Sequence, residues 1–157
     1  MSRRDRRYCY VATGYLVRDG KTLLIKHKKL KMWLPPGGHI DEGETPDEAV
    51  LREALEETGL EAEFVVPPRA PVMRLGRVES QHEPQRVQIE EIPGHNHHID
   101  FIFYLRAKPG AHVHRPDESD DIRWHTPEEL GLPHVPEEVR DSGREAIALV
   151  EASTRIP

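Results

Sequence analysis

The sequence predicts one α/β domain in which helices cover both faces of a mixed β-sheet. A length of 157 residues suits a single domain that spans the whole chain, 1–157. β-rich runs come first, a well-capped helix follows, and further β-rich runs precede a second helix. Strands that flank a helix can pair in parallel, whereas strands joined by a tight turn pair antiparallel. We therefore expect both kinds of pairing in one sheet.

The N-terminal part of the chain predicts a β-hairpin. β-rich segments occupy residues 8–17 and 22–27. Asp19-Gly20 between them is a strong signal for a two-residue turn. We expect the basic residues 1–7 in front of the hairpin to form a flexible tail.

One helix is marked at both ends. Thr45 is a suitable N-cap, Pro46 suits the first helical position, and Glu48 completes a capping box with Thr45. Gly59 is the expected stop signal at the other end. Together these residues predict a helix from Pro46 to Thr58.

The remaining elements follow from apolar patterning and turn signals. The last of them has an apolar stripe that contains Val139, Ala146, Ile147 and Val150. We expect strands at residues 61–66, 86–92, 99–105 and 122–124, a brief helix at 126–129, and a last helix from 136 to about 152.

Composition excludes several classes of partner. A net charge of −6 and a pI near 5.9 argue against binding to a long nucleic acid. A small phosphorylated ligand stays compatible, because one bound cation can reverse the field of an acidic site. The sequence contains one cysteine, Cys9, and no run that approaches the roughly 18 apolar residues of a membrane span. We therefore expect a cytoplasmic protein without membrane contact.

Three carboxylates lie on the predicted helix at positions i, i+3 and i+4: Glu53, Glu56 and Glu57. At about 100° per residue they share one sector of the helix. The opposite side is apolar, and we expect it to face the core with Leu51, Ala54, Leu55 and Thr58. A solvated acidic surface is one interpretation of the carboxylates, and a site for a hard divalent cation is the other.

A longer pattern surrounds these carboxylates and covers 23 of the 157 residues. It reads Gly38-x5-Glu44-x7-Arg52-Glu53-Ala54-x-Glu56-Glu57-x-Gly59-Leu60. This pattern resembles the Nudix box, the signature of the Nudix hydrolase family, although Ala54 stands where a larger aliphatic side chain is more usual. The resemblance implies a Nudix-type α/β/α sandwich with a mixed β-sheet.

The resemblance also implies a site for Mg²⁺ or Mn²⁺. The metal ligands would be the three box glutamates and a backbone carbonyl of one of two glycines: Glu53, Glu56, Glu57, and Gly37 or Gly38. Arg52 would orient a box glutamate, and Glu48, four residues before Arg52, can pair with its guanidinium. Glu44 would form a hydrogen bond within the loop. Oxygen ligands alone favour Mg²⁺ or Mn²⁺ over zinc.

The general base stays open between a box glutamate and an acid from a later loop. That loop contains Asp117, Glu118, Asp120 and Asp121, and among these we favour Glu118. A solvated acidic turn is the alternative interpretation of this group.

Candidate substrate contacts also lie before the box. Lys28 belongs to a basic run at residues 26–31 that either contacts phosphate or forms a solvated hairpin end. Trp33 either stacks on a nucleobase or packs locally against the protein.

Histidines form two further groups. His95, His97 and His98 come just before a predicted strand, and His97 or His98 is a candidate contact to substrate phosphate. His112 and His114 alternate along the chain, so a strand there would present both on one face and allow a second metal site. A polar loop and an edge strand are the alternative.

These features together predict a metal-dependent hydrolase that cleaves the diphosphate linkage of a nucleoside diphosphate joined to another moiety. A non-catalytic nucleotide-binding module of the same fold is the alternative, but the charged box positions are intact. An isomerase of isoprenoid diphosphates ranks below both, because Cys9 lies in the first strand.

The substrate stays open at this point. Leu75, Gly76 and Arg77 stand where some subfamilies carry a marker proline or tyrosine, and neither marker is present. Nucleoside triphosphates, nucleotide sugars and capped RNA ends are all compatible. The expected partner is a small-molecule nucleotide, and a homodimer is left open.

Overall fold

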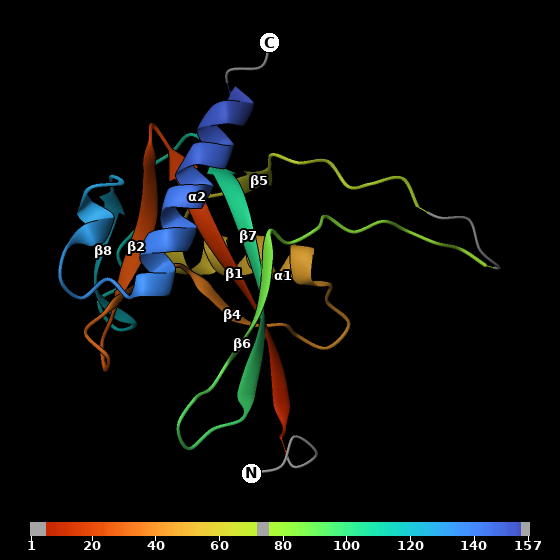
Figure 1. Cartoon of the computed structure of the whole chain (residues 1–157), viewed down its shortest axis with the longest axis horizontal. Coiled ribbons are helices and arrows are strands. Elements are labelled where there is room, and N and C mark those ends of the chain that lie inside the picture. Colours follow the sequence, from red (N-terminus) through yellow and green to blue (C-terminus); the bar gives the residue numbers. More distant parts are fainter. Residues whose placement is uncertain (1–5, 72–75, 155–157) are drawn as a thin grey trace.

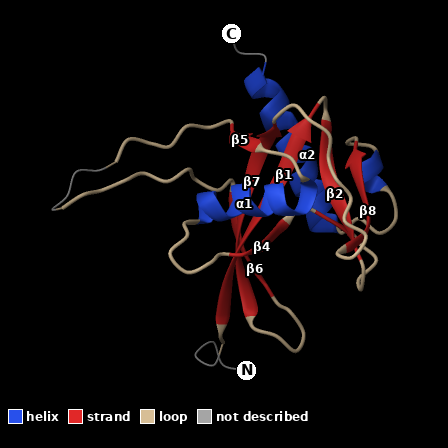
Figure 2. Cartoon of the chain, turned by 180° about the vertical axis from the view of Figure 1, so that it is seen from behind, coloured by secondary structure: helices blue, strands red, loops and turns tan. Residues whose placement is uncertain are grey.

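The computed structural model describes residues 6–71 and 76–154, which form a mixed β-sheet with one long helix on each face (Figures 1 and 2). Most of the predicted basic tail and Leu75 lie outside these described residues. Neither α1 nor α2, the two long helices of the described part, combines the length and the hydrophobicity that a membrane-spanning helix requires.

The elements follow the predicted order. In chain sequence they are β1 (Tyr8–Arg18), β2 (Lys21–His27), β3 (Trp33–Leu34), β4 (Gly37–His39), α1 (Pro46–Thr58), β5 (Ala62–Phe64), β6 (Arg86–Glu90), β7 (His97–Ala107), β8 (Ser119–His125), the 3-10 helix η2 (Glu129–Gly131) and α2 (Glu137–Thr154).

The sheet is mixed, as predicted. Within the described residues it has eight strands, and its main path runs β3-β2-β1-β7-β5. β4 pairs with β1, β6 pairs with β7, and β8 pairs with β2. β1 and β7 run parallel from Tyr8 opposite His97 to Val17 opposite Arg106, and the other pairings are antiparallel.

Local signals placed the hairpin and the first helix correctly. Asp19 and Gly20 both have positive φ, 51° and 72°, which is the backbone that the two-residue turn requires. Helix α1 has the predicted bounds, and its Thr45 and Glu48 form the complete capping box. Gly59 ends the helix with a φ of 76°.

Two hydrophobic layers hold the helices on the sheet. On one face, Val50 and Ala54 of α1 pack with Leu16 and Phe103 from the two central strands. On the other face, α2 packs its predicted stripe against neighbours that include Tyr15, Leu24 and Tyr104. Successive strand residues therefore alternate between an α1 side and an α2 side of the sheet.

The predicted orientation of α1 is partly wrong. Its buried residues are Ala49, Val50, Ala54 and Thr58, while Leu55 is 46% exposed. Glu53 follows Ala49 and Val50 by one helical turn, so it projects from the buried side. Only 15% of its side chain is exposed. The glycines of β4 have no side chains, and the space they leave beneath the helix takes carboxylates instead of leucines.

Several boundaries also differ from the expectation. β5 is shorter than the predicted strand 61–66, while β7 and β8 extend beyond the predicted 99–105 and 122–124. The brief helix begins at Glu129 instead of 126, and Thr126 and Glu129 exchange hydrogen bonds across the turn before it. His112 and His114 lie in the connection between β7 and β8 and belong to no strand.

Candidate functional site

The loop before α1 brings the box glycines against the box glutamates. β4 pairs with β1, with Gly37 opposite Thr13 and Gly38 opposite Ala12. A Cβ atom added to Gly38 would lie 2.6 Å from Cδ of Glu53, so this position has room only for hydrogen. The carboxylate of Glu53 therefore lies directly against the backbone of the loop.

Arg52 is the centre of the charged network on this loop. Its Nε and Nη2 donate to the two carboxylate oxygens of Glu44 at 2.7 and 2.9 Å. Its Nη1 donates to Glu53 at 2.9 Å and to Glu56 at 3.1 Å. The predicted pairing of Arg52 with Glu48 is wrong, because the Glu48 carboxylate accepts from the backbone of Thr45 in the capping box.

A bidentate Arg–carboxylate pair is geometrically specific, and it holds the guanidinium over the glutamates. The same guanidinium donates from Nη2 to the backbone carbonyl of His39 at 3.0 Å. Glu44 in turn accepts from the backbone N–H of Asp41 at 3.1 Å. Arg52 thus ties the helix to both ends of the loop that precedes it.

Glu57 is the most perturbed carboxyl of the box. The backbone N–H of Gly37 donates to its Oε1 at 2.9 Å. Burial, followed by the nearby Glu53 and Glu118 carboxylates, raises the pKa of Glu57 to about 8 despite that hydrogen bond. Carboxylates held this close without a cation retain a proton, and a divalent cation would replace it.

The donor set fits a hard divalent cation. Glu53, Glu56 and Glu57 supply oxygen atoms only, the β4 glycines add backbone carbonyls nearby, and these are ligands that Mg²⁺ and Mn²⁺ prefer. Glu56 is the most open of the three, with 58% of its side chain exposed.

The acids of the later loop differ in their surroundings. Asp120 pairs with Lys31 at 2.5 Å, and Asp121 pairs with Arg123 at 2.7 Å. Glu118 contributes to the raised pKa of Glu57, so its charge lies close enough to act on the box. Glu118 is therefore the acid of this group whose charge bears on the box glutamates.

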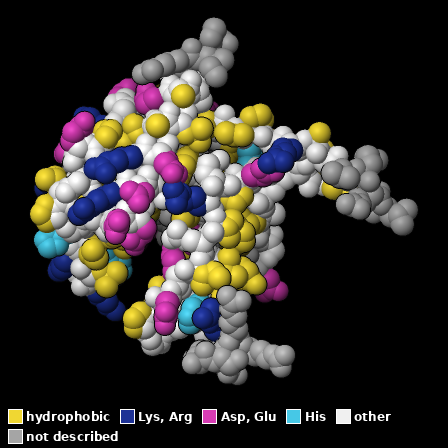
Figure 3. Space-filling model, viewed as in Figure 1, with side chains coloured by type: hydrophobic (Ala, Val, Ile, Leu, Met, Phe, Trp, Pro, Cys, Tyr) yellow, Lys and Arg dark blue, Asp and Glu magenta, His cyan; other side chains and the backbone are white. Residues whose placement is uncertain are grey.

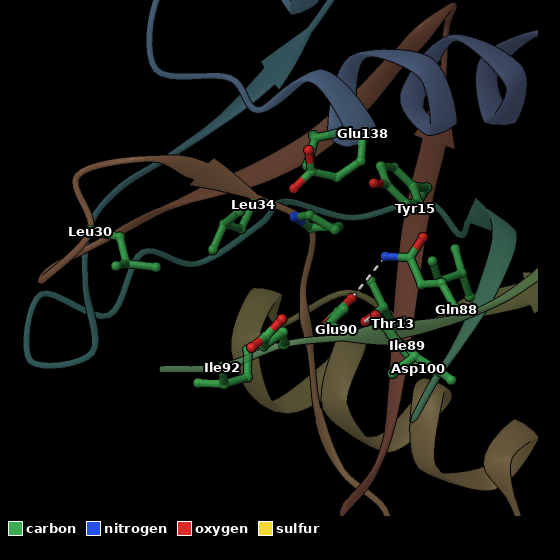
Figure 4. A pocket seen from close by; sticks show the side chains of 14 residues that line it. Thr13, Tyr15, Leu30, Leu34, Gln88, Ile89, Glu90, Ile92, Asp100 and Glu138 are labelled. Carbon is green, nitrogen blue, oxygen red and sulfur yellow. Dashed lines mark hydrogen bonds between the residues drawn. The ribbon is translucent and has the colours of Figure 1, made fainter. Parts of the chain in front are cut away.

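A cavity of about 570 Å³ lies on the other face of the sheet, between the start of α2, β1, β6 and β7 (Figure 4). It opens as a hollow bordered by acidic side chains, next to hydrophobic side chains that gather over β6 (Figure 3). Pro35 lines it, and β4, which leads into the box, begins two residues later at Gly37. Its volume suits a small-molecule ligand.

Polar side chains point into this cavity from β1, β6 and β7 (Figure 4). Gln88 donates to Glu90 at 2.9 Å, and Thr13 donates to Oδ2 of Asp100 at 2.9 Å. Burial and the neighbouring Glu90 raise the pKa of Asp100 to about 9. Its Oδ1 is buried and has no hydrogen-bond partner within the described part of the chain.

Asp100 was missed as a site residue. The sequence did contain a signal, an aspartate within the apolar run at residues 99–105. Burying a carboxyl costs free energy, so an aspartate in a buried strand indicates a partner or a functional role. Its position beside Glu90 depends on the β6–β7 register, which pairs Gln88 with Asp100 and cannot be read from local sequence.

The two candidates before the box, Lys28 and Trp33, have different surroundings. Trp33 packs edge-on against His125, with 4.8 Å between ring centroids, and Lys26 and Arg123 lie over its ring. This arrangement favours the local-packing interpretation of Trp33. Lys28 is exposed in the turn after β2.

The histidine candidates separate in the structure. His97 packs edge-on against Tyr8, with 6.1 Å between ring centroids. Nδ1 of His98 lies 3.7 Å from a carboxylate oxygen of Glu90, which lines the cavity. Burial lowers the pKa of His98. His114 contacts the backbone carbonyl of Ser119 at 3.0 Å, and His112 packs against Trp124. His112 and His114 do not form a joint metal-binding group within the described residues.

Two curated proteins are similar to this chain over about two thirds or more of its length. The chain is 30% identical to a MutT-like protein of Streptomyces ambofaciens over 122 residues, which are 74% of this chain and 63% of that protein. It is 33% identical to an RNA pyrophosphohydrolase of Aeromonas hydrophila over 115 residues, 68% of this chain and 63% of that protein. The chain thus spans less than two thirds of the length of these curated relatives.

Solved structures show the same fold. The crystal structure of a NUDIX-family hydrolase from Clostridium perfringens superposes with a TM-score of 0.73 at 27% identity, covering 90% of this chain and 97% of that one. The family model described as the NUDIX domain matches residues 10–150. With this match over most of its length, the chain belongs to the Nudix family.

Proposed function

We propose that this protein is a Mg²⁺- or Mn²⁺-dependent hydrolase that cleaves the diphosphate linkage of a nucleoside diphosphate joined to another moiety. The observation that carries the proposal is the close contact of the Glu53 and Glu57 carboxyls with the backbone of Gly38 and Gly37. In this position the pKa of Glu57 is raised to about 8. Two carboxyls in such contact destabilise the protein unless a proton or a cation lies between them.

The cation site would use oxygen atoms of Glu53, Glu56 and Glu57, with a backbone carbonyl of Gly37 or Gly38. A bound divalent cation supplies positive charge against the diphosphate and against the charge that develops when water attacks phosphorus. Arg52 keeps the Glu53 carboxylate in one orientation. Glu44 keeps Arg52 in place by its bidentate pair.

In the reaction, the oxygen of water forms a bond to phosphorus, the bridging P–O bond breaks, and the proton of water passes to a carboxylate. A box glutamate and Glu118 are the two candidates for this base. Glu118→Gln separates them: loss of the acidic limb of the pH–rate profile supports Glu118, and an unchanged profile assigns the base to the box.

The nucleobase would occupy the cavity on the α2 side of the sheet. The polypeptide from Pro35 to Gly37 connects this cavity to the box loop. The Glu90 carboxylate accepts hydrogen bonds, and a protonated Asp100 can donate one and accept others. Bases that present adjacent N–H donors, as guanine does at its ring nitrogen and amino group, complement these groups. Guanine nucleotides therefore belong first in a substrate panel, before nucleotide sugars and capped RNA ends.

The test is a panel of nucleoside diphosphate derivatives incubated with Mg²⁺ or Mn²⁺, with product release followed by chromatography. We expect turnover of at least one compound, loss of turnover in Glu56→Gln, and parent-like turnover in the control Glu61→Gln, an exposed glutamate outside the box. Metal binding without turnover of any compound would contradict hydrolysis and favour the nucleotide-binding module. Parent-like turnover by Glu56→Gln would contradict the metal site.

A further inference from the structure

Nitrogen and sulfur donors gather at a second place, near the start of β1. Ligand atoms of Cys9, His39 and His95 all lie within 4.8 Å of one another. Among residues 6–71 and 76–154, this is the one group of three or more Cys, His, Asp or Glu side chains that meets so closely. It shares no side chain with the box glutamates.

Strand pairing explains why residues so distant in sequence converge here. β1 places Cys9 opposite His98 on β7 and Val11 opposite His39 on β4. Successive strand residues face opposite sides of a sheet. Gly38 faces Glu53 on the α1 side, so the next residue, His39, faces the other side.

His98 lies beside this group of three as a further imidazole. Its ring centroid lies 5.4 Å from that of His39 and 5.5 Å from that of His95. Its Nε2 is buried and has no hydrogen-bond partner in the described part of the chain. Its Nδ1 lies 3.7 Å from a carboxylate oxygen of Glu90. A carboxylate behind an imidazole is the arrangement that commonly orients a metal-binding histidine.

The thiol also has a polar neighbour. The side-chain amide of Asn96 donates to Sγ of Cys9 at 3.5 Å. This contact holds the cysteine side chain on the same side of the turn as His95. Asn96 follows His95 directly, so a single turn between β6 and β7 supplies both a nitrogen ligand and a hydrogen bond to the cysteine sulfur.

We propose that Cys9, His39, His95 and His98 form a binding site for Zn²⁺, separate from the Mg²⁺/Mn²⁺ site of the box. One thiolate and three imidazoles are a donor set that favours zinc over magnesium. Ligand atoms around a tetrahedral zinc are about 3.3–3.6 Å apart, given Zn–N and Zn–S bonds of about 2.0 and 2.3 Å. His39 and His95 are exposed, so their side chains are free to rotate inward by the remaining distance.

This zinc site would be structural, and it would restrain both the cavity and the box loop. Zinc would fasten the turn between β6 and β7 to β1 and β4, and Glu90 to Ile92 before that turn line the cavity. The carbonyl of His39 accepts from Arg52, so zinc would also restrain the box loop. Four protein ligands close the coordination sphere, which is typical of zinc sites that stabilise a fold.

Cobalt substitution tests the proposal without relying on hydrolysis. Chelator-treated protein without a polyhistidine tag is titrated with Co²⁺, and its absorption spectrum is recorded. We expect a thiolate-to-cobalt charge-transfer band and tetrahedral d–d bands that saturate at one equivalent and disappear when Zn²⁺ is added. Cys9→Ser and His95→Ala should lose the charge-transfer band, whereas the control His112→Ala should keep it.

The same experiment distinguishes this site from the box. Glu56→Gln should leave the cobalt spectrum unchanged, and millimolar Mg²⁺ should not displace the cobalt. A missing charge-transfer band at one equivalent of Co²⁺ would overturn the proposal, as would an intact band in His95→Ala and His98→Ala. Zn²⁺ should raise the unfolding temperature of the parent by several degrees and leave that of His95→Ala unchanged. Failure of these results would leave the hydrolase proposal standing, because no readout depends on turnover.

Discussion

Replacing Gly38 by alanine should damage the box while leaving the fold almost intact. The new Cβ would lie 2.6 Å from Cδ and 2.9 Å from Oε2 of Glu53. Ordinary contacts between such atoms are about 3.5 Å or more, so the carboxylate must move by about 1 Å. Gly38 has no positive φ to lose, so backbone strain adds nothing to the effect.

The expected effect on hydrolysis is large. A misplacement of about 1 Å in a catalytic group can cost about 10²-fold in rate. The effect on stability should be small, because the hydrogen bond from Arg52 to Glu53 is partly solvated and Glu44 still holds the guanidinium. We expect kcat/KM to fall about 10²-fold and the free energy of unfolding by less than about 2 kcal/mol.

The adjacent Gly37 provides a matched control. A Cβ there would lie 2.6 Å from the backbone oxygen of Ala12 and 3.0 Å from Cα of Thr13, so β4 would have to separate from β1. Gly37→Ala should therefore lose about 1–3 kcal/mol of stability, as overpacking does.

The assay combines steady-state hydrolysis of the best panel substrate in Mg²⁺ with urea unfolding of both variants. Parent-like kcat/KM in Gly38→Ala would refute the reasoning, since the carboxylate of Glu53 would then tolerate displacement. A larger loss of stability in Gly38→Ala than in Gly37→Ala would refute the claim that Gly38 meets a movable carboxylate while Gly37 meets the β1 backbone.

Three further predictions use the same structure. The raised pKa of Glu57, about 8 against about 4.5 for a solvated glutamate, means that the folded chain binds more protons than the unfolded chain between those values. Urea unfolding in chelator should show stability falling as pH rises from 5 to 8, Glu57→Gln should remove most of this slope, and an unchanged slope would contradict the prediction. The pKa of Asp100 is raised in the same way, from 3.8 to about 9, so the parent loses stability as pH rises through this range. Asp100→Asn lacks this titration and should therefore gain stability relative to the parent, by a few kcal/mol, as pH rises toward 9. No relative gain at pH 9 would show that Asp100 is ionised in the fold. Thr45→Ala removes the N-cap that accepts from Glu48 and should lose about 1 kcal/mol in urea unfolding at pH 7, and an unaltered midpoint would contradict the role of the cap.

Features set by neighbouring residues were predictable. The bounds of α1 depend on Thr45, Pro46 and Gly59, each of which acts within one turn of the helix. The Asp19-Gly20 turn depends on two positive φ angles that these residues adopt more readily than most. The spacing of the box glutamates placed them on one helix, and the family match over residues 10–150 agrees with that interpretation.

The side of α1 that meets the sheet was not predictable from a helical-wheel projection. Such a projection weighs side chains only, so it placed Leu55 on the side that faces the core and the glutamates on the opposite side. The actual choice depends on what lies beneath the helix, and there the glycines of β4 leave room for carboxylates. Arg52 bonds with Glu44 across the loop and not with Glu48 along the helix, because the Glu48 carboxylate already accepts from Thr45 in the capping box.

Groups that require strand register were the hardest to foresee. Cys9 and His98 are brought together by a parallel pairing, and Asp100 meets Glu90 through the β6–β7 register. Nothing in the local sequence specifies either pairing. The sequence showed the histidines and the isolated cysteine separately, and only the sheet makes them neighbours.

The parallel pairing of β1 with β7 has a consequence for the order in which the protein folds during synthesis. β1, β4 and α1 all lie within residues 8–58, so the box can begin to assemble while the rest of the chain is still absent. The cavity needs Asp100 from β7 and Glu138 from α2, and both emerge from the ribosome much later. Parallel pairing between distant segments forms slowly, so β1 stays unpaired on the side where β7 later pairs with it. A nascent chain of this protein should therefore gain its metal-binding loop before it gains the pocket for a base.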